Sequence, residues 1–311
     1  MSDDDLEGTV SWAELARETE AILSAAGFAD ASGQARRIAM RASGADGEEW
    51  LSRSADLATK RGVASLDAMV ARRLTGEPLQ YVLGEWGFRY LDLFIDRRVL
   101  IPRPETEVVA GLALAELARS GEDGRPLMAA DLGTGSGAIG LALVTEHPTV
   151  ELWLTDVSSD ALDVARANLA GIGRAAARVR VEEGSWFDAL PLGLRSGLDL
   201  VVSNPPYVTI AEELPADVAD WEPELALRVG PEGTEALDVL VAEAPAWLRS
   251  DGALVLEMAP HQVEPVAERA RAHFAQVETH RDLAGRWRAV VARHPSAEIA
   301  EIRSDAGPTD N

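Results

Sequence analysis

The sequence predicts an α/β protein in which helices cover both faces of a mostly parallel sheet, preceded by a small helical bundle and a β-hairpin. Three observations predict this fold class. Apolar residues recur at three- and four-residue spacing before Gly76, short β-rich runs follow, and strand-like and helical stretches alternate from about Glu105 onward. With 311 residues, the chain is long enough for one large domain and a smaller companion.

Residues 1–75 are predicted to form a separate helical bundle. Ser11 and Glu14 have the spacing of a capping box, and Gly27 is placed to end the helix that follows. Further helices are expected at residues 32–43, 48–60 and 65–74. Such a bundle serves either as a packing module or as a docking surface.

Residues 76–104 are predicted to link the bundle to the larger domain. Two β-rich runs bounded by charged turns, Phe88–Phe94 and Arg98–Ile101, are expected to pair as a hairpin.

The larger domain is predicted over residues 105–295. Apolar runs of strand length lie at 127–132, 150–155, 179–182, 198–203, 253–257 and 288–292. The helical stretches that separate them include 138–146, 159–169 and 235–248. This alternation is typical of a parallel sheet buried on both faces. The last residues, 296–311, have the polar, small-residue composition of a disordered tail.

Composition excludes several classes of protein. The 29 basic and 52 acidic residues give a net charge of −23, which disfavours direct binding to nucleic acid. The absence of cysteine excludes disulfides, thiolate nucleophiles and zinc-thiolate sites, and the five histidines lack ligand spacing, so no metal site is expected. No apolar run reaches the about 18 residues of a membrane span, and no secretory signal opens the chain, so we expect a cytoplasmic protein without membrane contact.

A glycine-rich turn follows the strand at 127–132, and it reads Asp131-Leu132-Gly133-Thr134-Gly135-Ser136-Gly137. Glycines let the backbone turn sharply and approach a ligand closely, and the free N–H groups of the next helix attract polar or anionic groups. Together with Gly140 the turn also satisfies the dinucleotide-binding fingerprint. A tight strand-to-helix turn without a ligand is the alternative interpretation.

Asp156 ends the next predicted strand, about 20 residues further on. A carboxylate there can accept hydrogen bonds from the two hydroxyls of a ribose, although it could also cap the next helix. The glycine turn and the acidic strand end together favour an adenosine-containing ligand. They do not distinguish NAD from S-adenosylmethionine.

The most informative motif follows the strand at 198–203 and reads Asn204-Pro205-Pro206-Tyr207. Two prolines remove two backbone donors and fix two φ angles, so the chain leaves the strand rigidly. The Asn204 side chain and the Pro205 carbonyl can then bind a planar –NH₂ group through its two hydrogens, while Tyr207 supplies an aromatic wall. A nicotinamide enzyme has no use for such an arrangement.

With these motifs the sequence resembles the class I S-adenosylmethionine-dependent methyltransferases, and within them the HemK/PrmC family of peptide chain release factor glutamine N5-methyltransferases. Further matching stretches are Gly76-Glu77-Pro78, Phe88-x-x-Leu91 and Leu100-Ile101-Pro102-Arg103-Pro104-Glu105-Thr106-Glu107. The resemblance implies a Rossmann-like, mostly parallel seven-stranded sheet. It also implies methyl transfer to the side-chain amide nitrogen of the glutamine in the Gly-Gly-Gln motif of class I release factors.

The resemblance further implies a role for each matching residue. The glycine turn would line the methionine part of S-adenosylmethionine, Asp156 would bind its ribose, and Trp186 would lie against its adenine. The implied cofactor contacts are Asp131, Gly133, Thr134, Gly135, Ser136, Gly137, Asp156, Trp186 and Asn204. The implied contacts to the substrate glutamine are Asn204, Pro205, Pro206 and Tyr207. Residues 1–75 would correspond to the domain that docks the release factor.

Three alternatives stay open. A methyltransferase acting on a ribosomal-protein glutamine usually lacks the wording at 103–107, and a DNA adenine N6-methyltransferase would carry a basic target-recognition region. An NAD-sensing or purely binding module would need the Asn-Pro-Pro-Tyr motif to be accidental. Two departures from the family pattern, Glu257-Met258-Ala259 and Gly285-Arg286-Trp287-Arg288, are expected to affect the far end of the sheet and to leave the pocket untouched.

Overall fold

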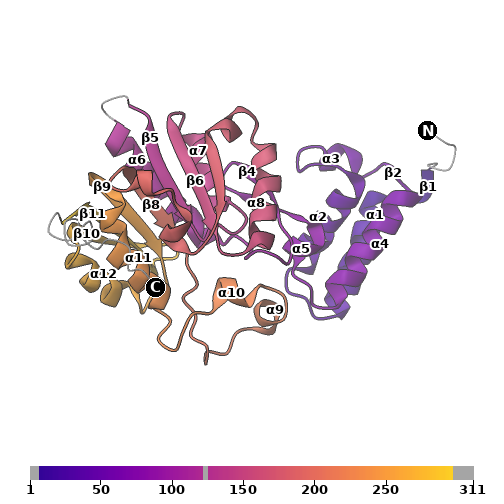
Figure 1. Ribbon diagram of the computed structural model, residues 1–311. Coiled ribbons are helices and arrows are strands. Elements are labelled where there is room, and N and C mark those ends of the chain that lie inside the picture. The colour runs from indigo at the N-terminus through magenta and orange to yellow at the C-terminus, as the bar shows by residue number, and fades with distance from the viewer. Residues whose placement is uncertain (1–6, 122–124, 297–311) are drawn as a thin grey trace. The chain divides into compact units, whose positions relative to one another are not determined.

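The computed structural model describes residues 7–121 and 125–296, and these divide into two compact units (Figure 1). One unit holds the residues up to Glu85 together with Ala216–Trp221, and the other holds Trp86–Pro215 and the residues from Glu222 onward. The change of unit therefore lies inside the segment predicted as a linker. Apart from Ser296, the predicted tail lies outside the described residues.

The first unit is mainly helical, as predicted. Its helices are α1 (Trp12–Ala25), α2 (Ala31–Ser43), α3 (Trp50–Arg53), α4 (Lys60–Leu74), α5 (Leu79–Leu83) and α9 (Ala216–Ala219). Strands β1 (Glu7–Ser11) and β2 (Leu57–Thr59) pair antiparallel beside them. Aliphatic and aromatic side chains, Leu23 and Ile38 among them, form a core of the unit's own.

Helix starts in this unit are set by side-chain caps. The predicted capping box is confirmed, because the Ser11 hydroxyl accepts from the Glu14 N–H and the Glu14 carboxylate accepts from the Ser11 N–H. The prediction of one helix over 48–60 is wrong in its second half. There Thr59 accepts from the Gly62 N–H at 3.0 Å, so α4 begins at Lys60 and the residues before it form β2.

The hairpin at the start of the second unit is confirmed, with different strands. It consists of β3 (Glu85–Phe88) and β4 (Leu91–Phe94), and its turn includes Arg89 at a φ of 52°. The predicted second strand at 98–101 is wrong. The Asp96 carboxylate accepts from both the backbone and the guanidinium of Arg98, and this local pairing closes a turn instead of leaving an extended strand.

The second unit contains the predicted seven-stranded, mostly parallel sheet. Its strands are β5 (Leu127–Leu132), β6 (Val150–Asp156), β7 (Val179–Glu183), β8 (Leu198–Ser203), β9 (Leu248–Glu257), β10 (Phe274–Arg281) and β11 (Trp287–Pro295). Their order across the sheet is β10-β11-β9-β8-β5-β6-β7. Only β11 runs against the others, because it pairs antiparallel with both of its neighbours.

Helices cover this sheet on both faces. They are α6 (Pro104–Ser120), α7 (Ala138–Glu146), α8 (Ser159–Gly171), α11 (Glu235–Glu243) and α12 (Val263–Arg271), whereas the short α10 (Glu224–Leu227) lies in the segment between β8 and α11. Two neighbouring residues of β5 show which helix lies on which face of the sheet. Leu132 packs with α11, whereas Asp131 accepts a hydrogen bond from Gly140 of α7, so α7 and α11 lie on opposite sides. None of the described helices combines the length and the apolar composition needed to cross a bilayer.

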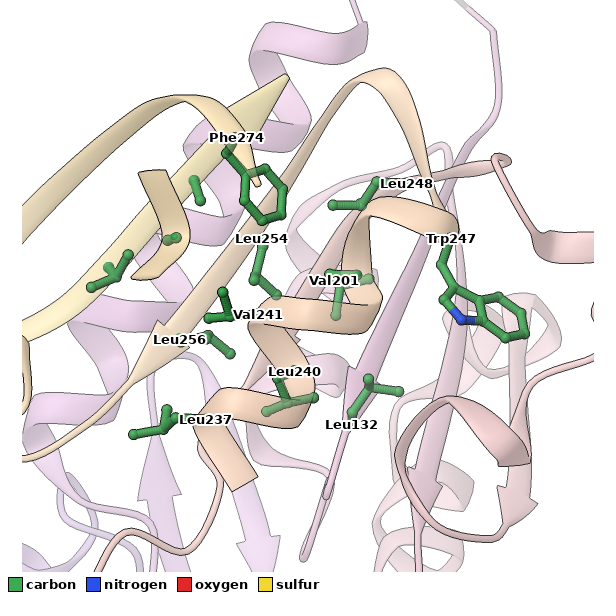
Figure 2. Close-up of a cluster of buried hydrophobic side chains, with 14 of the residues drawn as sticks. Leu132, Val201, Leu237, Leu240, Val241, Trp247, Leu248, Leu254, Leu256 and Phe274 are labelled. Atoms are coloured by element: carbon green, nitrogen blue, oxygen red, sulfur yellow. The ribbon is translucent and has the colours of Figure 1, made fainter. Parts of the chain in front are cut away.

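The face covered by α11 and α12 contains a large hydrophobic cluster (Figure 2). Leu237, Leu240 and Val241 of α11 point toward Val201, Leu254 and Leu256 of the central strands. The predicted helix over 235–248 ends earlier than expected. Pro245 lacks the N–H that would continue the helix, so a 3₁₀ turn, η6 (Ala244–Ala246), follows α11 and β9 begins at Leu248.

Truncating this cluster is expected to cost much of the unit's stability. We expect Leu240→Ala to lower the free energy of unfolding by about 2–5 kcal/mol, because a fully buried leucine leaves a cavity that its neighbours fill only partly. Val239→Ala in the same helix, at an exposed position, is the matched control and is expected to cost less than about 1 kcal/mol. Urea unfolding measures both, and equal losses would contradict the packing shown in Figure 2.

Candidate functional site

A cavity of about 350 Å³ lies where three parallel strands end. Strands β5, β6 and β8 run in the same direction, so their carboxyl ends meet at one edge of the sheet, where open α/β sheets bind ligands. Most of the predicted site residues line the cavity: Asp131, Gly133, Thr134, Gly135, Ser136, Asp156, Trp186, Asn204 and Pro206. Gly137, Pro205 and Tyr207 adjoin these residues in the chain but do not line the cavity.

The glycine turn after β5 depends on a left-handed backbone. Gly133, Gly135 and Gly137 have φ values of 71°, 56° and 85°, which other residues rarely adopt. The N–H groups of Gly133 and Thr134 both donate to the carbonyl of Thr155 in β6, at 2.8 and 2.9 Å. The turn is therefore tied to the neighbouring strand and presents its outer side to the cavity.

Asp131 supports this turn from beneath. Its Oδ2 accepts from the Thr134 hydroxyl at 2.7 Å and from the Gly140 N–H at 2.9 Å. A side chain at Gly140 would meet Leu154 at 2.3 Å, so this glycine allows α7 to pack closely on the sheet. Within the described residues Oδ1 of Asp131 has no hydrogen-bond partner, and burial, reinforced by the nearby charge of Asp156, raises the pKa of this carboxyl to about 6.

Asp156 at the end of β6 faces the same turn. Its Oδ2 accepts from the Gly135 N–H at 2.9 Å, and its Oδ1 accepts from the Ser158 N–H at 2.9 Å. Burial raises the pKa of this carboxyl. The cap of α8 is Ser158, whose hydroxyl accepts from the Ala161 N–H, so Asp156 is not needed for that purpose.

Trp186 forms the wall beside the glycine turn. It opens the 3₁₀ turn η4 (Trp186–Ala189) at a φ of 44°, a left-handed conformation that is costly for a tryptophan. A side chain at Gly133 would lie 3.3 Å from its ring. The strained backbone thus holds a large aromatic surface beside the turn, and strain of this kind is concentrated at functional sites.

Asn204 leaves β8 in a fixed orientation. The preceding Ser203 donates its hydroxyl to the Leu132 carbonyl at 2.6 Å, which joins the ends of β8 and β5. The Asn204 Nδ2 donates to the Thr106 hydroxyl of α6 at 3.4 Å. Its Oδ1 is thereby left as an acceptor for a ligand. Thr106 itself lines the cavity and was not predicted as a site residue.

The stretch at 103–107 joins several parts of the second unit. Arg103 forms an ion pair with the buried carboxylate of Glu222, and Glu105 pairs with Arg286 at 2.9 Å and with Arg288 at 3.6 Å. Its charged residues therefore bind other elements rather than the cavity. The two arginines belong to one of the departures from the family pattern and still pair with this stretch.

Glu257 at the end of β9 connects the far part of the sheet with the cavity. Its side chain is buried, and within the described residues its Oε2 has no hydrogen-bond partner. Burial raises the pKa of Glu257 to about 7, against the opposing effects of the nearby Thr106 hydroxyl and of Arg288.

The remaining wall comes from residues that were not predicted to belong to the site. They include Val99 and Leu100, and the chain from Pro223 to Val229 around α10. An isolated β-bridge pairs Arg228 with Val208, so the segment around α10 returns to the end of β8. For the segment around α10, the sequence offers only four residues with two leucines, and so short a pattern cannot be distinguished from that of an ordinary surface turn.

The cavity suits a cationic adenosine derivative. Two carboxylates with raised pKa values would be favoured in their ionised form by a positive charge, and one buried oxygen of Asp131 lacks a partner within the described residues. Asp156 can accept from ribose hydroxyls, and Trp186 offers a ring for stacking. In the part of the chain that the structure describes, no group of three or more His, Cys, Asp or Glu side chains is placed to hold a metal ion.

Comparison with known proteins identifies the family. Residues 14–84 match the PrmC N-terminal domain, and residues 114–219 match the methyltransferase small domain. A release factor glutamine methyltransferase from Xylella fastidiosa is 42% identical over 235 residues, covering 74% of this chain and 82% of the relative. The chain belongs to the release factor glutamine methyltransferase family.

Other members of the family match over even more of the chain. The release factor glutamine methyltransferase from Cereibacter sphaeroides is 37% identical over 283 residues, which is 88% of this chain and 95% of the relative. The one from Deinococcus radiodurans is 42% identical, over 72% and 77% respectively. Among solved structures, a methyltransferase from Pyrococcus furiosus is 19% identical, with a TM-score of 0.47 over 72% of this chain and 96% of that one.

Membership in the release factor glutamine methyltransferase family decides three sequence predictions. The protein is an enzyme, it has the class I methyltransferase fold, and its cofactor is S-adenosylmethionine. The alternative of an NAD-sensing or purely binding module is wrong. The roles of the individual site residues stay predictions.

Proposed function

We propose that this methyltransferase transfers a methyl group from S-adenosylmethionine to the side-chain amide nitrogen of the glutamine in the Gly-Gly-Gln motif of class I peptide chain release factors. The observation that carries the proposal is the orientation of Asn204, whose Nδ2 donates to Thr106 and whose Oδ1 is left as an acceptor at the cavity. A primary amide brings two N–H hydrogens to such a place.

An amide nitrogen is a poor nucleophile, because its lone pair is delocalised into the carbonyl group. The Asn204 Oδ1 at the cavity would accept one amide hydrogen, and the carbonyl of Pro205, which lies between the lining residues Asn204 and Pro206, would accept the other. Together they would aim the lone pair along the transfer direction. Both hydrogen bonds strengthen as the nitrogen gains positive charge in the transition state. Pro205 and Pro206 carry no N–H, so the chain itself offers no competing donor at this point.

The cofactor is held by the groups at the ends of β5 and β6. The glycine turn would bind its methionine part, Asp156 its ribose hydroxyls and Trp186 its adenine, with Asp131 balancing positive charge from beneath the turn. When bound, the cofactor supplies a sulfonium methyl group: the N–CH₃ bond forms as the S–CH₃ bond breaks, the electron pair stays on sulfur, and the nitrogen then releases one proton to water.

The N-terminal unit is proposed to dock the release factor, in agreement with the match of residues 14–84 to the PrmC N-terminal domain. A glutamine flanked by glycines lies on a flexible loop, which suits entry into a narrow cavity. A net charge of −23 disfavours a nucleic acid as the direct partner. The proposed place of action is the cytoplasm, where release factors act on ribosomes.

The substrate is tested by offering purified release factor, ribosomal proteins and adenine-containing DNA separately with the labelled cofactor. We expect label only in the release factor, at the glutamine of Gly-Gly-Gln, as located by mass spectrometry of the peptides. Label in a ribosomal-protein glutamine would favour the related ribosomal enzymes. Label in DNA would overturn the proposal of a protein substrate, and label at another release factor residue would contradict the glutamine site.

A further inference from the structure

A buried glutamate joins two segments of the second unit that line the cavity. The Oε2 of Glu222 accepts from the Ile101 N–H at 3.2 Å, and its Oε1 pairs with the guanidinium of Arg103. The Glu222 side chain is 1% exposed and the Arg103 side chain is 33% exposed, so the carboxylate is withdrawn from water. We call these three residues the clasp. None of the three lines the cavity itself.

Each side of the clasp is next to a wall of the cavity. Pro223 follows Glu222 and opens the segment 223–229, which we call the strap. The strap residues that line the cavity are Pro223, Leu225, Ala226, Arg228 and Val229. On the other side of the clasp, both chain neighbours of Ile101 line the cavity. The clasp therefore holds together two walls that are 121 positions apart in the sequence.

The far end of the strap is tied to the chain that follows the Asn-Pro-Pro-Tyr motif. The Val208 N–H donates to the Leu227 carbonyl at 3.0 Å, and the Val229 N–H donates to the Val208 carbonyl at 2.9 Å. The Arg228 guanidinium donates to the carbonyls of the next two residues after Val208, at 2.7 and 3.0 Å. The strap is thus joined to the side of the cavity where Asn204 lies, whereas the cofactor groups stand at the ends of β5 and β6.

Between its two ends the strap is a short and exposed helix. α10 has four residues, and a helix of one turn is not stable by itself. Leu225 in α10 is 59% exposed although it also lines the cavity. The position of this wall therefore depends on the anchors at its ends. At the clasp end the anchor includes a buried ion pair, and breaking such a pair from one side is costly because it strands the other charge.

We propose that Arg103 and Glu222 are positioning residues that hold the strap as the wall against which the substrate glutamine side chain is aligned. The inference rests on the proposed function, since it assigns this wall to the glutamine. A displaced wall lets the amide turn away from the sulfonium methyl, and a misplacement of about 1 Å can lower a rate by about a hundredfold. Arg103 and Glu222 act through the strap and touch neither substrate nor cofactor.

The first test is Arg103→Met in the full-length protein, which removes the cation that faces the buried carboxylate. We expect the single-turnover rate at saturating release factor to fall roughly tenfold or more. The KM for release factor and the calorimetric affinity for the cofactor are expected to stay within a few-fold of wild type. An unchanged cofactor stoichiometry shows that the fraction of active enzyme is the same. A wild-type rate would overturn the inference, and so would an equal loss of cofactor affinity.

A double variant tests whether the two residues act as a pair. In Arg103→Met/Glu222→Gln the glutamine keeps an acceptor oxygen for the Ile101 N–H and carries no charge. Because neither charge is then stranded, the rate is expected to return to within about threefold of wild type. No recovery would overturn the inference and would indicate that the charge of Arg103 acts on the reaction by itself.

The matched control is Arg125→Met at the opposite end of β8. Arg125 pairs with the Asp199 carboxylate, which is as buried as that of Glu222 and also accepts a backbone N–H, from Met128 at 2.8 Å. This variant breaks a similar ion pair away from the strap. It is expected to lower the thermal stability of the protein and to keep the wild-type rate per bound cofactor.

A spin label tests the strap without any substrate. The chain has no cysteine, so Glu224→Cys gives a single attachment site on α10, where the side chain is 85% exposed. The nitroxide is expected to become more mobile in Arg103→Met and to stay as in wild type in Arg125→Met. Unchanged mobility in Arg103→Met would overturn the inference.

Glu222→Gln replaces Arg103→Met in both measurements if Arg103→Met does not fold. It weakens the same pair from the other side, and the rate is expected to fall about threefold while the nitroxide becomes more mobile. Wild-type behaviour in either measurement would overturn the inference. Failure of the wild-type protein to label the release factor glutamine would instead overturn the proposed function, whereas the spin-label result does not depend on the substrate.

Discussion

Asn204→Ala is expected to lower the single-turnover rate of methyl transfer by roughly two or more orders of magnitude, the usual effect of losing one oriented transition-state partner. The variant removes the Oδ1 that would accept a substrate hydrogen, and it leaves the glycine turn, Asp156 and Trp186 in place. Quenched-flow transfer to intact release factor, with enzyme in excess, measures this step without product release.

Cofactor affinity in the same variant is the control, and it is expected to stay within a few-fold of wild type. Asn204 lines the cavity but makes its hydrogen bond to Thr106 and not to the glycine turn. Near-normal transfer in Asn204→Ala would show that the proposed amide clamp is wrong. Equal losses in cofactor affinity and transfer would place Asn204 in cofactor binding instead.

Asp156→Ala is expected to weaken cofactor binding by on the order of 1–3 kcal/mol, the cost of leaving hydrogen-bond partners unpaired. The structure adds a second cause to the loss of the ribose contacts. Asp156 also accepts from the N–H groups of Gly135 and Ser158, so its removal loosens the turn that would bind the methionine part. Calorimetric titration with the cofactor or its demethylated product measures the change.

Two companion variants sharpen this experiment. Glu151→Ala removes an exposed carboxylate from the other end of the same strand, and its cofactor affinity is expected to equal that of wild type. Asp156→Asn keeps one acceptor oxygen and is expected to lie between wild type and Asp156→Ala. Unchanged affinity in Asp156→Ala would contradict the assignment of the ribose to this carboxylate.

The sequence by itself determined the central strands and the turns that follow them. The predicted bounds of β5 and β8 agree with the structure, since strands buried on both faces are mostly apolar. The glycine turn was equally readable, because three positive φ angles in one turn favour glycine at each place. The two prolines after Asn204 were readable in the same way, because each fixes its own φ angle and removes an N–H. Pro206 lines the other side of the cavity.

Only the tertiary structure decided which residues stand behind that cavity. The strand β10 was missed because it lies at the edge of the sheet and is mostly exposed, so its side chains follow no apolar pattern. Thr106 and Asn204 are 98 positions apart, and Glu257 lies further along the chain. Nothing in local spacing distinguishes a buried glutamate such as Glu257 from one that faces water. The difference is made by the packing of α6 against β8 and β9, which removes water from the carboxylate.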